Sequence, residues 1–147
     1  MKIRQDFVTN SSSSSFIISL EKKPNTIGEF YDLIYGDYRY GDTGLLQKLF
    51  DDMPEEGLTE EQIINSFCEE DWTYRELGWR KACDIGWHEK VEFNKVKGKE
   101  EAESFIKDNK NCFIFEVEYE DDGDNMENRL KDSTLIDKVN CKIFSHH

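Results

Sequence analysis

The chain of 147 residues has the length of one ordinary domain, and its aromatic content of 13% is too high for a disordered chain even though 35% of its residues are charged. Its longest apolar runs are far shorter than the roughly 18 residues of a membrane span, so no membrane protein is expected. The formal net charge of -13 argues against nonspecific nucleic-acid binding, which requires Lys and Arg to displace counterions.

The N-terminal segment and the cysteines indicate a compartment. Asp6 and a run of serines stand where a secretory signal peptide has an unbroken apolar region. The cysteines are widely spaced, at Cys68, Cys83, Cys112 and Cys141, and none forms a CxxC pair. We therefore expect a cytoplasmic protein with reduced thiols.

The first half of the sequence predicts one strand followed by helices. Residues 15–20 form a β-branched and aromatic run that is typical of a buried strand. A capping box at Thr26 predicts a helix that ends at Gly36, and the apolar spacing of residues 45–50 predicts a short second helix. A second capping box at Thr59 begins a long predicted helix over residues 60–78.

The second half predicts three strands and one helix. Apolar residues at odd positions predict a strand over 85–93, and residues 99–109 have a helical pattern. The apolar residues at odd positions from 113 to 119 alternate with Glu116, Glu118 and Glu120, and residues 139–143 also alternate. Because the elements lack a regular βαβ order, we expect an α+β fold in a single domain over 1–147. It has a mostly antiparallel sheet of about four strands packed with three to four helices, after a Ser-rich, flexible lead segment over residues 1–14.

The same periodicities predict the hydrophobic core. Its members are the apolar residues that recur on one side of each predicted element. They are Phe16, Ile18, Phe30, Ile34, Leu49, Ile64, Phe67, Trp72, Phe105, Phe113, Phe115, Val117 and Ile143.

The N-terminus carries a specific motif. Phe7, Val8 and Thr9 are followed by Asn10, Ser11, Ser12, Ser13, Ser14 and Ser15, and then by Phe16 and Ile17. This segment resembles the opening of a group of small bacterial and phage proteins, and the resemblance implies a phage or mobile-element origin without an agreed activity. The serine run lacks the glycines and the lysine of a phosphate-binding P-loop. It is either a flexible lead into the first strand or a site of phosphorylation.

Two acidic blocks hold the excess negative charge. Residues 51–71 contain nine carboxylates, residues 116–127 contain seven, and neither block has a Lys or Arg. One interpretation is a solvated acidic face. The other is a binding surface for a basic host protein, as in an inhibitor of a nucleic-acid-binding or defence protein. The predicted partner-binding residues are Glu69, Glu70, Asp71, Glu118, Glu120, Asp121, Asp122 and Asp124.

No established catalytic or metal motif occurs in the chain. The sequence has no G-x-S-x-G, HExxH, G-x-G-x-x-G or zinc-finger spacing, and residues 120–124 do not fit the EF-hand register. We therefore expect no metal and no cofactor, and the lack of these motifs favours a noncatalytic protein over an enzyme. Cys83 and His88 are five positions apart, and we expect a packed thiol and a surface imidazole rather than a nucleophile.

An aromatic ligand pocket is the alternative to an acidic binding surface. Tryptophans and basic residues alternate between residues 72 and 88, where they could hold an anionic ligand such as a nucleotide. The residues are Trp72, Arg75, Trp79, Arg80, Trp87 and His88. Tryptophans at helical spacing belong to a core more often than to a pocket, so this alternative ranks second.

Overall fold

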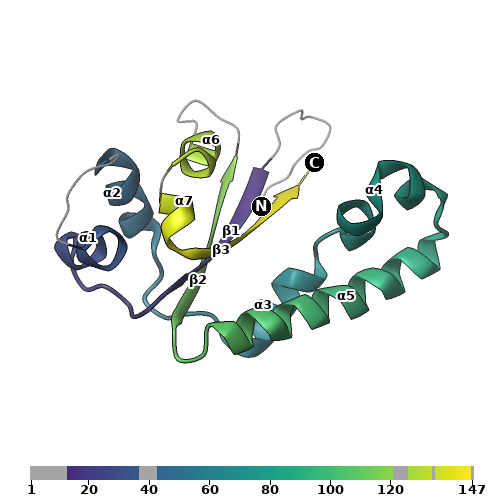
Figure 1. The fold of residues 1–147 in the computed structure, drawn as a ribbon, viewed down its shortest axis with the longest axis horizontal. Helices are drawn as coiled ribbons and strands as arrows, with labels where there is room; N and C mark the ends of the chain where they lie inside the picture. The colour runs from purple at the N-terminus through teal and green to yellow at the C-terminus, as the bar shows by residue number, and fades with distance from the viewer. Residues whose placement is uncertain (1–12, 37–42, 121–125, 134, 147) are drawn as a thin grey trace. The chain divides into compact units, whose positions relative to one another are not determined.

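The computed structural model describes residues 13–36, 43–120, 126–133 and 135–146 (Figure 1). The chain divides into two compact units. The sheet unit combines Met1–Gly57 with Asn111–His147, and the helical unit is Leu58–Lys110. None of the helices in the described ranges combines the length and apolar composition needed to cross a membrane.

The sheet unit is built around an antiparallel sheet in the order β2-β1-β3. The central strand β1 (Ser13–Leu20) pairs on one side with β2 (Phe113–Glu120) and on the other with β3 (Asn140–His146). In this register Phe16 lies opposite Val117 and Ile143. The α+β class and the antiparallel pairing are confirmed, but the described residues form three strands, fewer than the four expected.

In the described part of the sheet unit, four helices pack on the sheet (Figure 1). They are α1 (Ile27–Tyr35), α2 (Thr43–Asp52), α6 (Met126–Lys131) and α7 (Leu135–Lys138). The predicted cap is present on α1, where Thr26 Oγ1 accepts a hydrogen bond from the Glu29 amide at 3.1 Å. The helix ends at Gly36, whose φ of 68° is a conformation that favours glycine.

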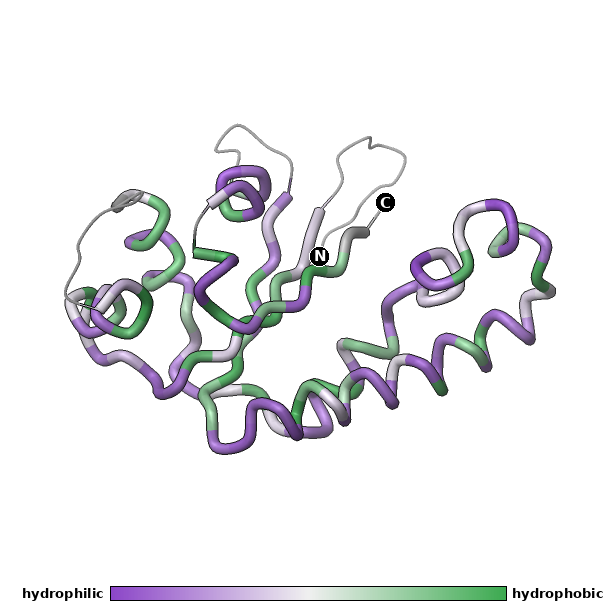
Figure 2. Tube along the Cα trace, viewed as in Figure 1, coloured by the Kyte–Doolittle hydropathy of each residue, from purple (hydrophilic) through white to green (hydrophobic). Residues whose placement is uncertain are grey.

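Alternate residues of the strands form the core of the sheet unit. Phe16, Ile18 and Leu20 of β1 belong to one buried cluster with Phe115 and Val117 of β2 and with apolar side chains of all four helices. The hydrophobic strand residues are visible in Figure 2 as green stretches of the sheet. The intervening positions Ile17, Ile114 and Phe144 are buried too, on the other face of the sheet.

The helical unit contains α3 (Glu60–Cys68), α4 (Trp72–Asp84) and α5 (Trp87–Asp108). The prediction of one helix over 60–78 is wrong, because the chain ends α3 at Cys68 and begins α4 at Trp72. The amides of Trp72 and Thr73 both donate to Asn94 Oδ1 of α5, at 2.7 and 3.1 Å, which fixes the new helix start.

The prediction of a strand over residues 85–93 is also wrong, because α5 begins at Trp87 and the residues that follow form its first turns. Trp87 and Val91 are four positions apart and therefore share a helix face, so their spacing fits a helix as well as alternation. Both are exposed, whereas a half-buried strand would have buried them. The 22-residue helix continues to Asp108 and so includes nearly all of the segment 99–109 that was predicted as helical.

A small core holds the helical unit together. Its buried side chains are Ile63, Phe67, Trp72, Ala82, Ala102 and Phe105. The rings of Phe67 and Phe105 lie 5.6 Å apart, and a Cβ built at Gly98 would stand only 2.7 Å from Cys68 Cα. Glycine at position 98 therefore permits the close approach of α5 to the end of α3.

The predicted core is largely confirmed. Ten of its thirteen members are buried, and the other three, Ile64, Phe113 and Ile143, are partly buried. In α3 the buried position is Ile63, one residue before the predicted Ile64.

Candidate partner-binding site

Strand β2 carries Glu116, Glu118 and Glu120 of the second acidic block, and Glu127 of the same block lies on α6. Tyr119 and Val117 are buried, whereas Glu118 and Glu120 are exposed and Glu116 is partly buried, as alternation along a strand requires. The Ser13 hydroxyl of β1 donates to Glu118 Oε2 at 2.9 Å. The predicted residues Asp121, Asp122 and Asp124 lie outside the described residues.

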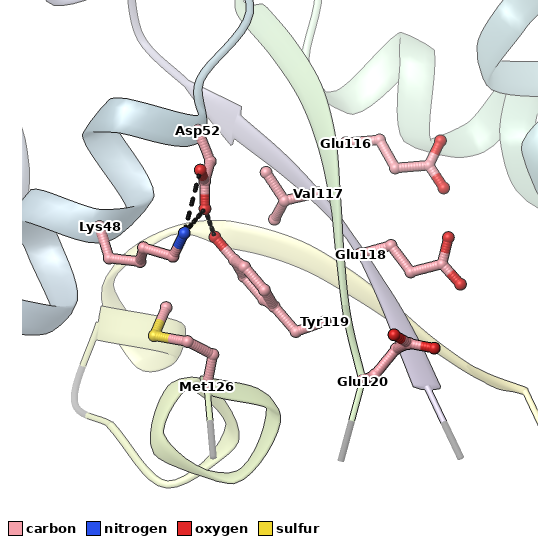
Figure 3. A pocket seen from close by; sticks show the side chains of 8 residues that line it. All are labelled: Lys48, Asp52, Glu116, Val117, Glu118, Tyr119, Glu120 and Met126. Carbon is pink, nitrogen blue, oxygen red and sulfur yellow. Dashed lines mark hydrogen bonds and ion pairs between the residues drawn. The ribbon is translucent and has the colours of Figure 1, made fainter. Parts of the chain in front are cut away.

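A groove of about 400 Å³ adjoins β2 (Figure 3). In the view, Val117 and Tyr119 point toward α2, and Glu116 and Glu118 point away from it. The complete lining consists of Lys48 and Asp52 of α2, Met126 of α6, and Glu116, Val117, Glu118, Tyr119 and Glu120 of β2. All of these residues belong to the sheet unit.

A tyrosine and a carboxylate connect the two walls of this groove. The Tyr119 hydroxyl donates to Asp52 Oδ2 at 2.7 Å, and Lys48 Nζ lies 3.5 Å from the same oxygen. Burial, the hydrogen bond to Asp52 and the negative charge of Asp52 raise the pKa of Tyr119 well above its ordinary value. The phenol therefore remains a hydrogen-bond donor and ties β2 to the end of α2.

The other predicted acidic residues lie in the helical unit, where Glu70 and Asp71 have structural roles. Glu69 is exposed at the end of α3. Glu70 Oε2 accepts a hydrogen bond from Arg75 Nη1 at 2.6 Å. The Asp71 carboxylate caps α4 by accepting from the Tyr74 amide at 3.2 Å, and its other oxygen lies 3.1 Å from Lys90 Nζ.

The pKa of Asp71 reflects these contacts. Burial alone would raise it, but hydrogen bonds from Thr73, Tyr74 and Lys90, together with the positive charge of Lys90, lower the pKa below its ordinary value. Asp71 therefore stays ionised and holds the start of α4 against α5.

The residues of the alternative pocket are divided between the core and the surface of the helical unit. Trp72 is buried, stacks on Phe67 at 6.4 Å and donates from Nε1 to the Phe67 carbonyl at 2.7 Å. The Arg75 guanidinium lies 5.3 Å from the Trp72 ring centre. Trp79 and Trp87 are 64% and 71% exposed, and Arg80 and His88 are exposed as well.

Part of the serine motif belongs to the sheet. Asn10, Ser11 and Ser12 lie outside the described residues, while Ser13, Ser14 and Ser15 begin β1. Ser14 is completely buried, and its hydroxyl donates to Glu127 Oε2 of α6, a buried carboxylate that lies 3.6 Å from Lys131 Nζ. Sequence analysis assigned no role to Glu127, Asp52 or Tyr119. The alternation of residues 113–119 indicates only that Tyr119 faces inward.

The cysteines show no reactive arrangement in the described structure. Cys83 is exposed at the end of α4, so the expectation of a packed thiol is wrong. His88 makes an edge contact with the Trp87 ring. Burial raises the pKa of Cys141 to about 12 and also raises the pKa of Cys68. Within the described ranges, no group of three or more His, Cys, Asp or Glu residues is placed to hold a metal ion.

Comparison with protein-family models, with curated proteins and with solved structures finds no match to this chain. The function is therefore inferred from the geometry of the site.

Proposed function

We propose that this chain is a small acidic interaction protein, of phage or mobile-element origin, that binds a basic surface of a host protein through β2. The observation that carries the proposal is the exposure of Glu118 and Glu120 on a strand that is anchored in the core of the sheet unit. Carboxylates on a fixed backbone can match basic side chains of a partner and accelerate their association. Inhibition of a nucleic-acid-binding or defence protein follows when the basic surface is the working surface of that partner.

The spacing of the carboxylates limits what the strand can imitate. Alternate residues of a strand are about 6.7 Å apart, whereas duplex DNA carries one negative charge per about 1.7 Å of its axis. Strand β2 is therefore suited to a few basic side chains on a protein rather than to a groove that is filled by a nucleic acid.

The test compares capture of proteins from a bacterial lysate by the immobilised chain and by charge-reversed variants. Glu118→Lys with Glu120→Lys changes the proposed surface. Glu92→Lys with Glu103→Lys makes the same charge change at exposed positions of α5. We expect a protein that the chain captures at about 50 mM salt, that is released near 500 mM, and that only the β2 variant fails to bind. Equal capture by both variants would refute the proposal.

Glu70 and Asp71 are unsuitable for this test. Both residues hold the start of α4, through Arg75 and the Tyr74 amide, so their reversal would alter folding as well as binding.

Binding of an anionic ligand is the second candidate, and the exposure of Trp79 and Trp87 is the observation that favours it. Adenosine triphosphate can be titrated while indole fluorescence is recorded. Saturable quenching that Arg80→Ala abolishes would favour the ligand site. The absence of saturable quenching up to millimolar nucleotide would leave the acidic surface as the better account.

A further inference from the structure

The outer side of β2 is an edge of the sheet. In the described part of the chain β2 pairs only with β1, which occupies the centre of the sheet. An edge strand has backbone N–H and C=O groups directed away from its one neighbour, and these groups can pair with another extended chain.

The groove described above runs along this edge. Its lining includes five consecutive residues of β2 and no residue of β1 or β3. Because successive side chains point to opposite faces of a sheet, a groove bordered by five successive residues must follow the backbone edge. At the beginning of β2, Gly57 packs against the Phe113 ring and the Ile114 carbonyl, so the accessible length is the second half of the strand.

The far wall of the groove is already in place. Asp52 and Lys48 at the end of α2 are held by the Tyr119 hydrogen bond and by their own ion pair (Figure 3). A groove whose walls are fixed before binding requires little ordering of the protein when a ligand enters.

The charge of this edge selects the occupant. Glu118 and Glu120 project from the same face of β2, two positions apart, and an added strand has the same spacing of about 6.7 Å between alternate side chains. Lys or Arg at alternate positions of that strand would stand opposite these carboxylates, a favourable cross-strand pair. A second copy of this chain would place glutamates opposite glutamates, and like charges directly opposite each other are destabilising.

We infer that the outer edge of β2, over residues 116–120, receives an extended, Lys/Arg-bearing segment of a partner protein as an additional strand of the sheet. The inference rests on the proposed function and specifies how the basic partner is held. Backbone pairing provides the contact, and the alternating basic side chains provide selection.

The test uses a capped eight-residue peptide that alternates Lys with Thr, labelled with a fluorophore. Its control has the same sequence with methyl groups on the four central amide nitrogens, which keeps every charge and removes the donors needed for pairing. We expect the methylated peptide to bind at least tenfold more weakly by fluorescence anisotropy. Glu118→Lys with Glu120→Lys should lose binding to a similar degree, while Glu92→Lys with Glu103→Lys should bind as the unmodified chain does.

Amide hydrogen exchange, measured by nuclear magnetic resonance, locates the bound peptide on the sheet. The bound peptide should protect amides in the second half of β2 and leave those of the other edge strand, β3, unchanged. Equal affinity for the methylated peptide, or new protection on β3, would overturn strand addition. Strand addition would also be overturned if sedimentation detected a dimer of the chain that forms through β2 and excludes the peptide.

The two proposals can fail separately. If the peptides do not bind but the β2 variant still loses a partner captured from lysate, strand addition is wrong and the acidic surface stands. If neither the peptide nor a captured protein responds to the β2 variant, both are wrong.

Discussion

The carboxylate of Asp71 shows how one side chain can begin a helix and also join it to a neighbour. One oxygen accepts hydrogen bonds from the Tyr74 amide and the Thr73 hydroxyl, and the other faces Lys90 of α5. A residue that looks like a free surface acid in the sequence is therefore part of the framework of the helical unit.

We predict that Asp71→Ala lowers the free energy of unfolding by about 1 kcal/mol, the usual cost of losing an N-cap acceptor. Asp71→Asn should cost less, because an amide oxygen still accepts the hydrogen bond while the attraction to Lys90 is lost. Urea unfolding measures both. Glu92→Gln, at an exposed position of α5, is the control and should change little.

The difference in free energy of unfolding between the unmodified chain and Asp71→Asn should depend on pH. The folded protein holds the pKa of Asp71 below its unfolded value, so the ionised carboxylate stabilises the folded state at neutral pH. This stabilisation is present above the unfolded pKa of about 3.9 and disappears as pH falls through the folded pKa. A difference that is the same at neutral pH and far below pH 3 would contradict this role.

The cysteines should differ widely in reactivity. The thiolate is the reactive form, and a pKa near 12 leaves about one Cys141 thiol in ten thousand ionised at pH 8. We predict that iodoacetamide labels exposed Cys83 first and Cys141 last, as measured by mass spectrometry of peptides. In denaturant, the labelling rates of the two cysteines should become equal. Labelling of Cys141 as fast as Cys83 in the folded protein would show that the last strand is more open than described.

At the scale of elements, Ser14 and Glu127 connect β1 to α6. Both side chains are buried, and the carboxylate also faces Lys131. We predict that Glu127→Ala lowers the free energy of unfolding by about 2 kcal/mol, because a hydrogen bond to a charged group is lost from the interior. Glu103→Ala, at an exposed position of α5, provides the control in urea unfolding. If Glu127→Ala lowers the free energy of unfolding no more than Glu103→Ala does, the stability of α6 does not depend on this contact.

Strand β2 could be predicted from its local pattern of apolar and charged side chains. Residues 115–120 alternate apolar side chains with glutamates, and they form most of β2, with Phe115 and Val117 in the core. The break between α3 and α4 was not predictable in this way. It depends on Asn94, more than twenty residues away in the chain, which accepts from the amides of Trp72 and Thr73.

The candidate site was predicted in part for a similar reason. Alternation identifies Glu118 and Glu120 as outward residues of a strand, because that property is local. The groove beside them depends on which strand lies at the edge and on the contact between Tyr119 and Asp52, sixty-seven positions apart. Neither follows from the spacing of residues along the chain.

At the scale of the whole molecule, acidic residues outnumber basic ones by 32 to 19. Some are compensated locally, as where Lys97 lies within 4 Å of Glu76, Glu100 and Glu101. The compensation is incomplete, because the chain has a formal net charge of -13. Salt weakens exposed ion pairs, which contribute little each, and it also weakens the repulsion that the excess charge creates.

Repulsion should dominate the response of stability to salt. We predict that raising sodium chloride from about 20 to 300 mM increases the melting temperature by about 2 to 4 °C, since the Debye length falls from about 20 Å to about 6 Å. Glu118→Lys with Glu120→Lys removes part of the excess negative charge, so the rise of its melting temperature with salt should be smaller. In low salt its melting temperature should be no lower than that of the unmodified chain. Differential scanning calorimetry measures both. A melting temperature that falls as salt is added would mean that ion pairs outweigh repulsion. A large loss of stability in the variant would mean that these two glutamates support the fold instead of remaining available to a partner.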